Sequence, residues 1–402
     1  MTTSQSDTLS RAALWLATGA AVSVLFSNAV CQILLGAALF TLLVSRRGLR
    51  FPPIVLPLAL FFAGTVLALA LSPDPRAGLP QVKKFYVWFM LPVLYTAIPG
   101  AAQVRTIFAS WGVLATASGL WAFVQFFQKR AAALASGEDF YLTYVARRAT
   151  GFMSHWMTFS AEQMMAGLLL ASLLLFGAIR GRRPLWWGAV AIIGASVLIA
   201  WTRSVWIGTA VGVCYLIGAW RPKLLLAVPV AAAVLFFAAP ESMQQRVTSV
   251  YKPHGNTDSN EHRNITRRTG IAMIQAHPWF GLGPEMPGRE FEKYLPADIP
   301  RPLPDGFYGH LHNVYLQYGA ERGIPTLLAF LWLIGKVLTD FLRGARGRNK
   351  AILHGAIAAI LGLLVEGFFE HNLGDSEVLT MFLIIVASGY IALRPEETTA
   401  DA

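Results

Sequence analysis

The chain has 402 residues, of which 55% are hydrophobic and only 14% are charged, and its formal net charge is +11. A soluble globular protein carries about 25% charged residues, so this composition excludes that class. We therefore predict an all-α polytopic membrane protein. The two cysteines, Cys31 and Cys214, both lie in apolar runs, which excludes a disulfide framework and a cysteine-based metal site.

Apolar runs long enough to cross a bilayer recur along the chain and predict about 12 transmembrane helices. Several runs are shorter than about 20 residues, so we expect boundaries to shift by a few residues and one or two runs to be re-entrant. We expect the first run to be a retained helix, not a signal peptide, because no small-residue cleavage site follows it. The predicted spans are Ala12–Ser27, Val30–Val44, Ile54–Leu71, Phe85–Ile98, Ile107–Phe127, Ser160–Ile179, Leu185–Thr202, Val205–Trp220, Leu224–Ala239, Ile324–Leu342, Ala351–Phe369 and Val378–Leu393.

An even number of spans places both termini on the same side of the membrane. The short loops on that side hold clusters of arginine and lysine at 46–50, 180–183 and 343–350. The positive-inside rule therefore predicts that both termini are cytoplasmic. The chain then divides into helices 1–9 over residues 1–239 with an outer loop at 128–159, a large outer loop at 240–323 that carries the catalytic residues, and helices 10–12 with the cytoplasmic C-terminus over residues 324–402.

Basic residues also lie on the outer side, against the same rule. Lys83 and Lys84 precede the fourth span, and Arg203 lies in the tight WTRSVW connection between two spans. Lysines there can neutralise lipid headgroups, but arginines at membrane level predict an anionic partner, because guanidinium groups match phosphate oxygens. Further candidates in the outer loops are Arg147, Arg148, His155, Arg263, Arg267 and Arg268.

The stretch GHLHNVYLQYGAERGIPT, residues 309–326, combines polar side chains with glycine directly before an apolar run. If it is helical from His312, that residue shares one face with Tyr315 and Gly319. Gly323 begins a Gly-Ile-Pro sequence that can bend the chain. We predict a histidine at the membrane surface, where it can act on a membrane-borne substrate. The candidate substrate-binding residues of this stretch are Asn313, Tyr315 and Gln317.

The large outer loop contains a second informative region. Residues Asn264–Ala276 can form an amphipathic helix, with Asn260 or Asn264 as its N-cap, and HPWFGLGP predicts a turn where that helix stops. Residues 288–303 resemble an amphipathic lid. The charged loop 370–377, between the last two spans, is expected to line the same cavity.

Three features together resemble the O-antigen ligase and polymerase superfamily. They are the arginine-containing turn WTRSVWIG, the arginine-led helix ending in HPWFGLG, and His312-Asn313 followed by Gly323-x-x-Thr326, which resembles the ligase signature. The resemblance implies a GT-C-type glycosyltransferase of the bacterial inner membrane. Such an enzyme moves O-antigen from undecaprenyl pyrophosphate to a sugar of lipid A-core on the periplasmic face. The implied partners are these two substrates and membrane lipids, and no nucleic acid is expected.

The resemblance also implies roles for single residues. The catalytic histidine of the family matches His312, and its two essential arginines match Arg203 and Arg263. Arg267 stands where the family usually has an aromatic residue, so the sequence leaves open which of Arg263, Arg267 and Arg268 meets phosphate. The chemistry agrees with these roles, because displacing a pyrophosphate needs positive charge on the leaving group and a base for the incoming hydroxyl. Histidine, which titrates near neutral pH, suits the base, and direct attack would invert the anomeric centre.

No cofactor and no metal are expected. His310-x-His312 would point its side chains apart on a helix. Asp375-x-Glu377 offers only two carboxylates, which make a thin Mg²⁺ site.

Other functions stay open. An O-antigen polymerase or a protein O-oligosaccharyltransferase would share the donor and differ in the acceptor. A lipid-linked oligosaccharide flippase or another transporter would place charges near the bilayer midplane, where Lys336 and Glu366 are the main ionisable residues.

Overall fold

The computed structural model describes residues 3–46, 48–252 and 260–395, and within these ranges all regular structure is helical. The helices in chain order are α1 (Thr3–Ser23), α2 (Asn28–Val44), α3 (Val55–Ala70), α4 (Pro75–Lys83), η1 (Lys84–Phe89), α5 (Met90–Ala97), α6 (Ala101–Ser136), α7 (Phe140–Ala146), α8 (Trp156–Leu175), α9 (Arg183–Ile199), α10 (Arg203–Trp220), η2 (Pro222–Ala227), α11 (Val228–Ala238), α12 (Glu241–Thr248), α13 (Asn260–Ala276), α14 (Met286–Arg289), η4 (Phe291–Tyr294), α15 (Val314–Gly344), α16 (Lys350–Glu366), η5 (Asn372–Gly374) and α17 (Ser376–Ala392).

Three of the described helices, α6, α8 and α15, are both long and apolar enough to cross a membrane. Shorter apolar helices are α2, α3, α9, α17 and the pair formed by η2 and α11. Each predicted apolar run coincides with helical structure, although the 3-10 helix η1 interrupts the fourth, so Phe85–Ile98 is not one α-helix. The all-helical class is thus confirmed for the described residues, whereas the count of about 12 spans stays a prediction.

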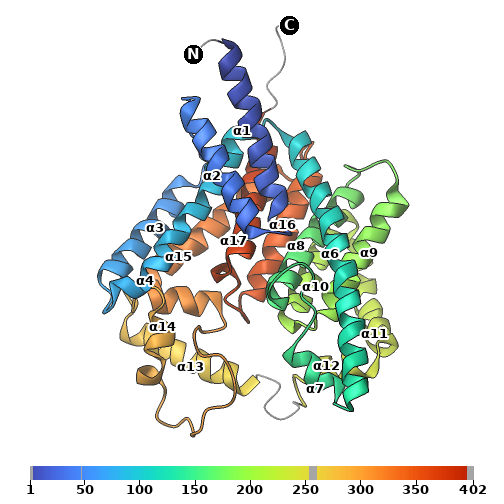
Figure 1. Ribbon diagram of the computed structural model, residues 1–402, viewed down its shortest axis with the longest axis vertical. Coiled ribbons are helices and arrows are strands. Elements are labelled where there is room, and N and C mark those ends of the chain that lie inside the picture. The colour runs from blue at the N-terminus through green and yellow to red at the C-terminus, as the bar shows by residue number, and fades with distance from the viewer. Residues whose placement is uncertain (1–2, 47, 253–259, 396–402) are drawn as a thin grey trace.

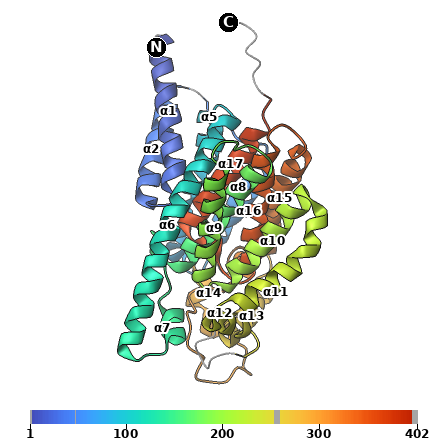
Figure 2. The ribbon, with the colours of Figure 1, turned by 90° about the vertical axis from the view of Figure 1, so that its right-hand side faces the viewer.

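The helices α8, α16 and α17 lie at the centre of the molecule (Figures 1 and 2), with α3 packed on α15 to one side and α9 and α10 on the other. Because α17 is apolar around its whole circumference, it is buried on every face from Val378 to Ala392. Between α10 and α16, a Cβ on Gly208 would lie 2.5 Å from the carbonyl oxygen of Gly362. Glycine at this position therefore permits the close approach of the two helices.

The long segments that follow α6 and α11 meet at one end of the molecule. The helices α7, α12, α13 and α14 gather there, whereas α1 begins and α17 ends toward the opposite end (Figure 1). Both predicted outer loops therefore lie on the same side of the helix bundle.

The helix α15 is broken at Gly323, whose φ is 77° and ψ is 168°. The HPWFGLGP turn fits against this break. The backbone N–H of Ile324 donates to the carbonyl oxygen of Pro278 over 2.7 Å, and that of Leu282 donates to the carbonyl of Ala320 over 2.8 Å. The turn therefore ties α13 to α15 and fixes the first part of α15, next to the site described below.

Replacing Gly323 by alanine is expected to lower the free energy of unfolding by about 2–4 kcal/mol. The new Cβ would sit on a residue with positive φ, 2.2 Å from the carbonyl oxygen of Trp279. Thermal unfolding in detergent measures the effect. Gly335→Ala is the matched control on the same helix, because a Cβ there meets no described atom within 4 Å. Equal melting temperatures for the two variants would contradict this role of Gly323.

Candidate active site

His312 lies before α15, not on it. Its φ is 48°, and Asn313 is the N-cap of the helix. The side-chain oxygen of Asn313 accepts the backbone N–H groups of Tyr315 and Leu316, and its amide donates to the carbonyl of Phe368. The prediction that the helix starts at His312 and places it on one face with Tyr315 is therefore wrong. The asparagine cap turns the chain, so that His312 faces the loop after α16.

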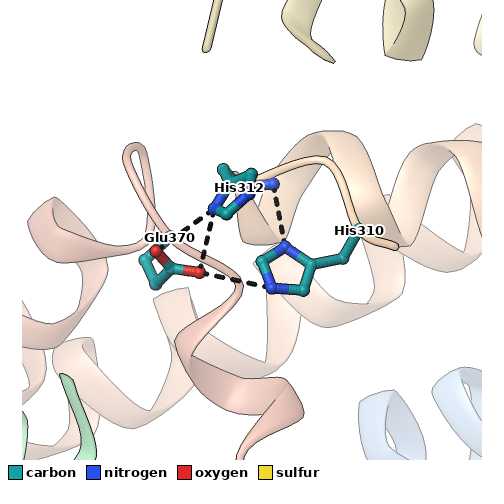
Figure 3. Close-up of side chains that lie close together, drawn as sticks. All are labelled: His310, His312 and Glu370. Atoms are coloured by element: carbon teal, nitrogen blue, oxygen red, sulfur yellow. Dashed lines mark hydrogen bonds and ion pairs between the residues drawn. The ribbon is translucent and has the colours of Figure 1, made fainter. Parts of the chain in front are cut away.

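The side chains of His310 and His312 converge on Glu370, which belongs to the loop between α16 and α17 (Figure 3). Nδ1 of His312 lies 3.4 Å from Oε2 of Glu370, and Nε2 of His310 lies 3.6 Å from Oε1. Burial alone would raise the pKa of Glu370, but the hydrogen bond to His312 and the nearby charges of His312, His310 and Arg263 lower it to about 2. Glu370 is therefore a buried, ionised partner of His312.

The carbonyl oxygen of Phe307 contacts two histidines. It lies 2.9 Å from Nε2 of His312 and 2.9 Å from Nε2 of His262. A carbonyl can only accept, so both nitrogens donate. Burial, and after it the charge of His312, lowers the pKa of both His262 and His310 to about 4, so these two rings are neutral at neutral pH. Nε2 of His312 faces this carbonyl and its Nδ1 faces the carboxylate of Glu370, an arrangement that stabilises an imidazolium.

A cavity of about 490 Å³ beside His312 is lined by three arginines, and we call it the cationic cavity. Arg203 begins α10, and its guanidinium donates to Oγ of Ser249 over 3.0 Å and to Oδ1 of Asn260 over 3.2 Å. Arg263 and Arg267 come from successive turns of α13 and share one face. The apolar part of the wall consists of Ile207, Val250, Leu311, Leu316, Phe368 and Phe369.

The structure separates the three arginines of α13. Arg263 lines the cationic cavity, and burial lowers its pKa while the carboxylate of Glu370 acts in the opposite direction. Arg267 also lines it and donates to the side chain of Asn264 over 2.9 Å. Arg268 lies outside the cavity and pairs with Asp298 over 2.7 Å. Two of the three arginines are therefore positioned toward an occupant of the cavity.

A second cavity, of about 320 Å³, has His310 and Glu370 in its wall. It is also lined by Glu285, Glu321 and Asp375, and we call it the acidic cavity. The charged loop 370–377 was expected to line the site, and its residues do line this cavity. Three predicted substrate-binding residues also line it, namely Lys84, His155 and Gln317.

Two of those three residues have local hydrogen bonds as well. Nδ1 of His155 accepts the backbone N–H of Met157 at the start of α8, over 3.2 Å. The amide of Gln317 donates to Glu321 over 2.8 Å, and its oxygen accepts the backbone N–H of Leu311. Both residues therefore help to hold the cavity wall in place.

Four predicted substrate-binding residues line neither cavity. Lys83 and Arg147 are exposed. The guanidinium of Arg148 lies 5.1 Å from the ring centre of Trp156, and burial among neighbouring arginines lowers its pKa to about 9. The hydroxyl of Tyr315 donates to a backbone carbonyl of α16 over 2.7 Å, so it joins α15 to α16.

Within the described residues, His310, His312 and Glu370 form a group whose ligand atoms all lie within 4.8 Å of one another. Two imidazoles and a carboxylate are ligands that Zn²⁺ accepts. The argument that His310 and His312 point apart is wrong, because neither residue lies on a helix. The three side chains could hold a divalent metal ion, which gives a reason to include a chelator in any assay.

Sequence reasoning missed Glu370 and His262 as individual site residues. Glu370 follows an apolar run, and a charge in that position was the available signal. His262 directly precedes Arg263, but its contact with Phe307 depends on a loop 45 residues away. Asn260 was considered only as a helix cap, whereas its side chain accepts a hydrogen bond from Arg203.

Replacing Glu370 by glutamine is expected to change the pH dependence of stability. The pKa of Glu370 is lowered from 4.5 to about 2. Its carboxylate therefore contributes stability above about pH 4.5, and this contribution is lost as the pH falls through about 2. The shift corresponds to about 3 kcal/mol. Melting temperatures in detergent should show a less stable variant at pH 7 and a smaller difference near pH 3. A difference that does not vary with pH would contradict this assignment.

Together, the membrane-length helices indicate a helical membrane protein, in which a buried histidine–carboxylate pair lies beside an arginine-lined cavity. Residues 188–331 match the family model described as O-antigen ligase, and this match supports a place for the chain in the O-antigen ligase and polymerase superfamily. Members of this family are glycosyltransferase-like enzymes of O-antigen processing. No curated protein matches the chain. The matched region contains Arg203, Arg263 and His312, whereas Glu370 lies beyond it.

Proposed function

We propose that the chain is an O-antigen ligase, which transfers O-antigen polysaccharide from undecaprenyl pyrophosphate to a sugar hydroxyl of lipid A-core. The observation that carries this proposal is that His312, Arg203 and Arg263 line one cavity whose remaining wall is largely apolar. Guanidinium groups suit the oxygens of a pyrophosphate, and the apolar wall suits the adjoining part of a polyprenyl chain.

In the proposed reaction, His312 is the neutral tautomer that holds its one proton on Nδ1, toward Glu370, and its Nε2 carries no proton and has turned away from the carbonyl of Phe307. Nε2 then takes the proton of the acceptor hydroxyl. Glu370 stabilises the imidazolium that forms. The hydroxyl oxygen bonds to the anomeric carbon of the donor, and the bond from that carbon to the pyrophosphate oxygen breaks. The electron pair leaves with undecaprenyl pyrophosphate, whose charge Arg203 and Arg263 stabilise. Direct attack inverts the anomeric centre, and no metal takes part.

The proposed topology follows the sequence prediction, with about 12 spans in a GT-C-type arrangement, cytoplasmic termini and a periplasmic active site. Its support is that the long outer segments gather at one end of the molecule, opposite the start of α1 (Figure 1). We propose the boundary between the large loop of residues 240–323 and helices 10–12 of residues 324–402 at the break in α15, because Gly323 interrupts the helix there. In intact cells, a membrane-impermeant thiol reagent should label a cysteine placed at Asp298 and not one at Arg346. Labelling at Arg346 and not at Asp298 would mean that the chain has the opposite orientation in the membrane.

The test of the function is transfer by the purified protein, with lipid-linked O-antigen, lipid A-core and EDTA. Glycan attached to lipid A-core in the presence of EDTA is the expected result. A lengthened donor glycan would instead indicate a polymerase, and glycan on a protein acceptor an O-oligosaccharyltransferase. Movement of the donor across the membrane of vesicles, with no new glycosidic bond, would indicate a flippase.

A further inference from the structure

The His310–Glu370 pair forms a wall between two cavities of opposite character. His312 lines the cationic cavity, and its partner Glu370 lines the acidic cavity together with His310. The close-up in Figure 3 shows that both His310 and His312 contact the carboxylate of Glu370. A molecule in the cationic cavity would lie next to His312, and a molecule in the acidic cavity would lie next to its partner Glu370.

The acidic cavity is rich in groups that accept hydrogen bonds. Five carboxyl groups line it, those of Glu285, Glu321, Glu366, Glu370 and Asp375. The lysine in its wall, Lys84, donates to a backbone carbonyl over 2.9 Å. Carboxyl groups thus outnumber the one lysine in its wall, whereas arginines dominate the other cavity. A phosphate or carboxylate would be repelled here.

One of these carboxylates has an acceptor atom left over. Glu321 is only 1% exposed, and its Oε1 accepts hydrogen bonds from the side chain of Gln317 and the backbone N–H of Glu285. Its Oε2 accepts no hydrogen bond from any residue that the structure describes, although the guanidinium of Arg322 lies 3.4 Å away. Nδ1 of His371, in the same wall, is also buried and unbonded among the described residues. Buried polar atoms normally have hydrogen-bond partners, so these two atoms mark hydrogen-bonding capacity that is left over behind the cavity wall.

We propose that the acidic cavity binds the acceptor sugar, and that this sugar is uncharged or carries an amine, not a phosphate or carboxylate. A sugar ring presents several hydroxyl donors, which suit carboxylate acceptors. The cavity volume of about 320 Å³ lies within the size range of small-molecule pockets. The pyrophosphate of the donor would then lie in the cationic cavity and the acceptor sugar in the acidic cavity. This inference rests on the proposed ligase function and names the acceptor class for it.

The test compares Michaelis constants of purified wild type and variants. Glu321→Gln keeps the shape and removes the charge, and it should raise the KM for lipid A-core by roughly tenfold or more while the KM for the donor changes little. Glu285→Gln should act in the same direction. Glu292→Gln is the matched control, because Glu292 is exposed and lines neither cavity. A variant that raises only the donor KM would overturn the assignment.

A second comparison does not depend on the variants folding. Wild type should use a lipid A-core whose terminal sugar is neutral at least roughly tenfold better than the same core phosphorylated on that sugar. Equal use of both acceptors would overturn the proposal while leaving the ligase function intact. If wild type transferred no glycan to lipid A-core, both the ligase function and the acceptor assignment would be overturned.

Discussion

Replacing His312 by asparagine is expected to lower the rate of glycan transfer by about 10²–10⁴-fold, the usual contribution of a general base. Asparagine tolerates the positive φ of 48° at this position better than most residues, so the loop should keep its path. It can also donate a hydrogen bond toward Phe307, but it cannot take up a proton at neutral pH. The expected loss is therefore chemical and not structural.

Single-turnover rates with saturating donor and acceptor measure this loss. His277→Asn is the matched control, because His277 is exposed, bonds to the hydroxyl of Tyr294 over 2.8 Å and lines neither cavity. It should transfer glycan at nearly the wild-type rate. If His312→Asn kept the rate and only weakened acceptor binding, His312 would position the acceptor instead of accepting its proton.

The local parts of the site could be predicted from the sequence, because they depend on short-range periodicity. Arg263 and Arg267 are four residues apart on an amphipathic helix, so their common face follows from helix geometry. The Gly-Ile-Pro sequence at Gly323 predicted a bend, and α15 breaks there. The apolar runs likewise predicted where the long helices lie.

The remaining parts depend on contacts between distant segments. Glu370 reaches His312 across 58 residues of sequence, and no periodicity connects the two. The position of His312 off the helix depends on the Asn313 side chain, which competes with the backbone for the first N–H groups of α15. The two cavities separate Arg267 from Lys84, and each takes part of its wall from the loop after α16, which meets segments far from it in the sequence.

Replacing Arg263 by glutamine is expected to reduce the rate of transfer by about 10²–10³-fold, because it removes a positive charge where the pyrophosphate charge develops. Its guanidinium makes no hydrogen bond to any other residue that the structure describes, so it is available to a ligand, whereas that of Arg203 already donates to Ser249 and Asn260. The loss of charge should raise the KM for the donor and lower kcat, with little effect on the KM for the acceptor.

The matched control is Arg268→Gln, one helical turn and one residue from Arg263 on the same helix. Arg268 pairs with Asp298 at the surface and lines neither cavity. Exposed ion pairs contribute about 0–1 kcal/mol, so this variant should keep both its melting temperature and its transfer rate close to wild type. Equal losses in the two variants would mean that the arginines act through the overall charge of α13. If only Arg268→Gln lost transfer rate, the phosphate contact would lie outside the cationic cavity. That result would contradict the role proposed for Arg263.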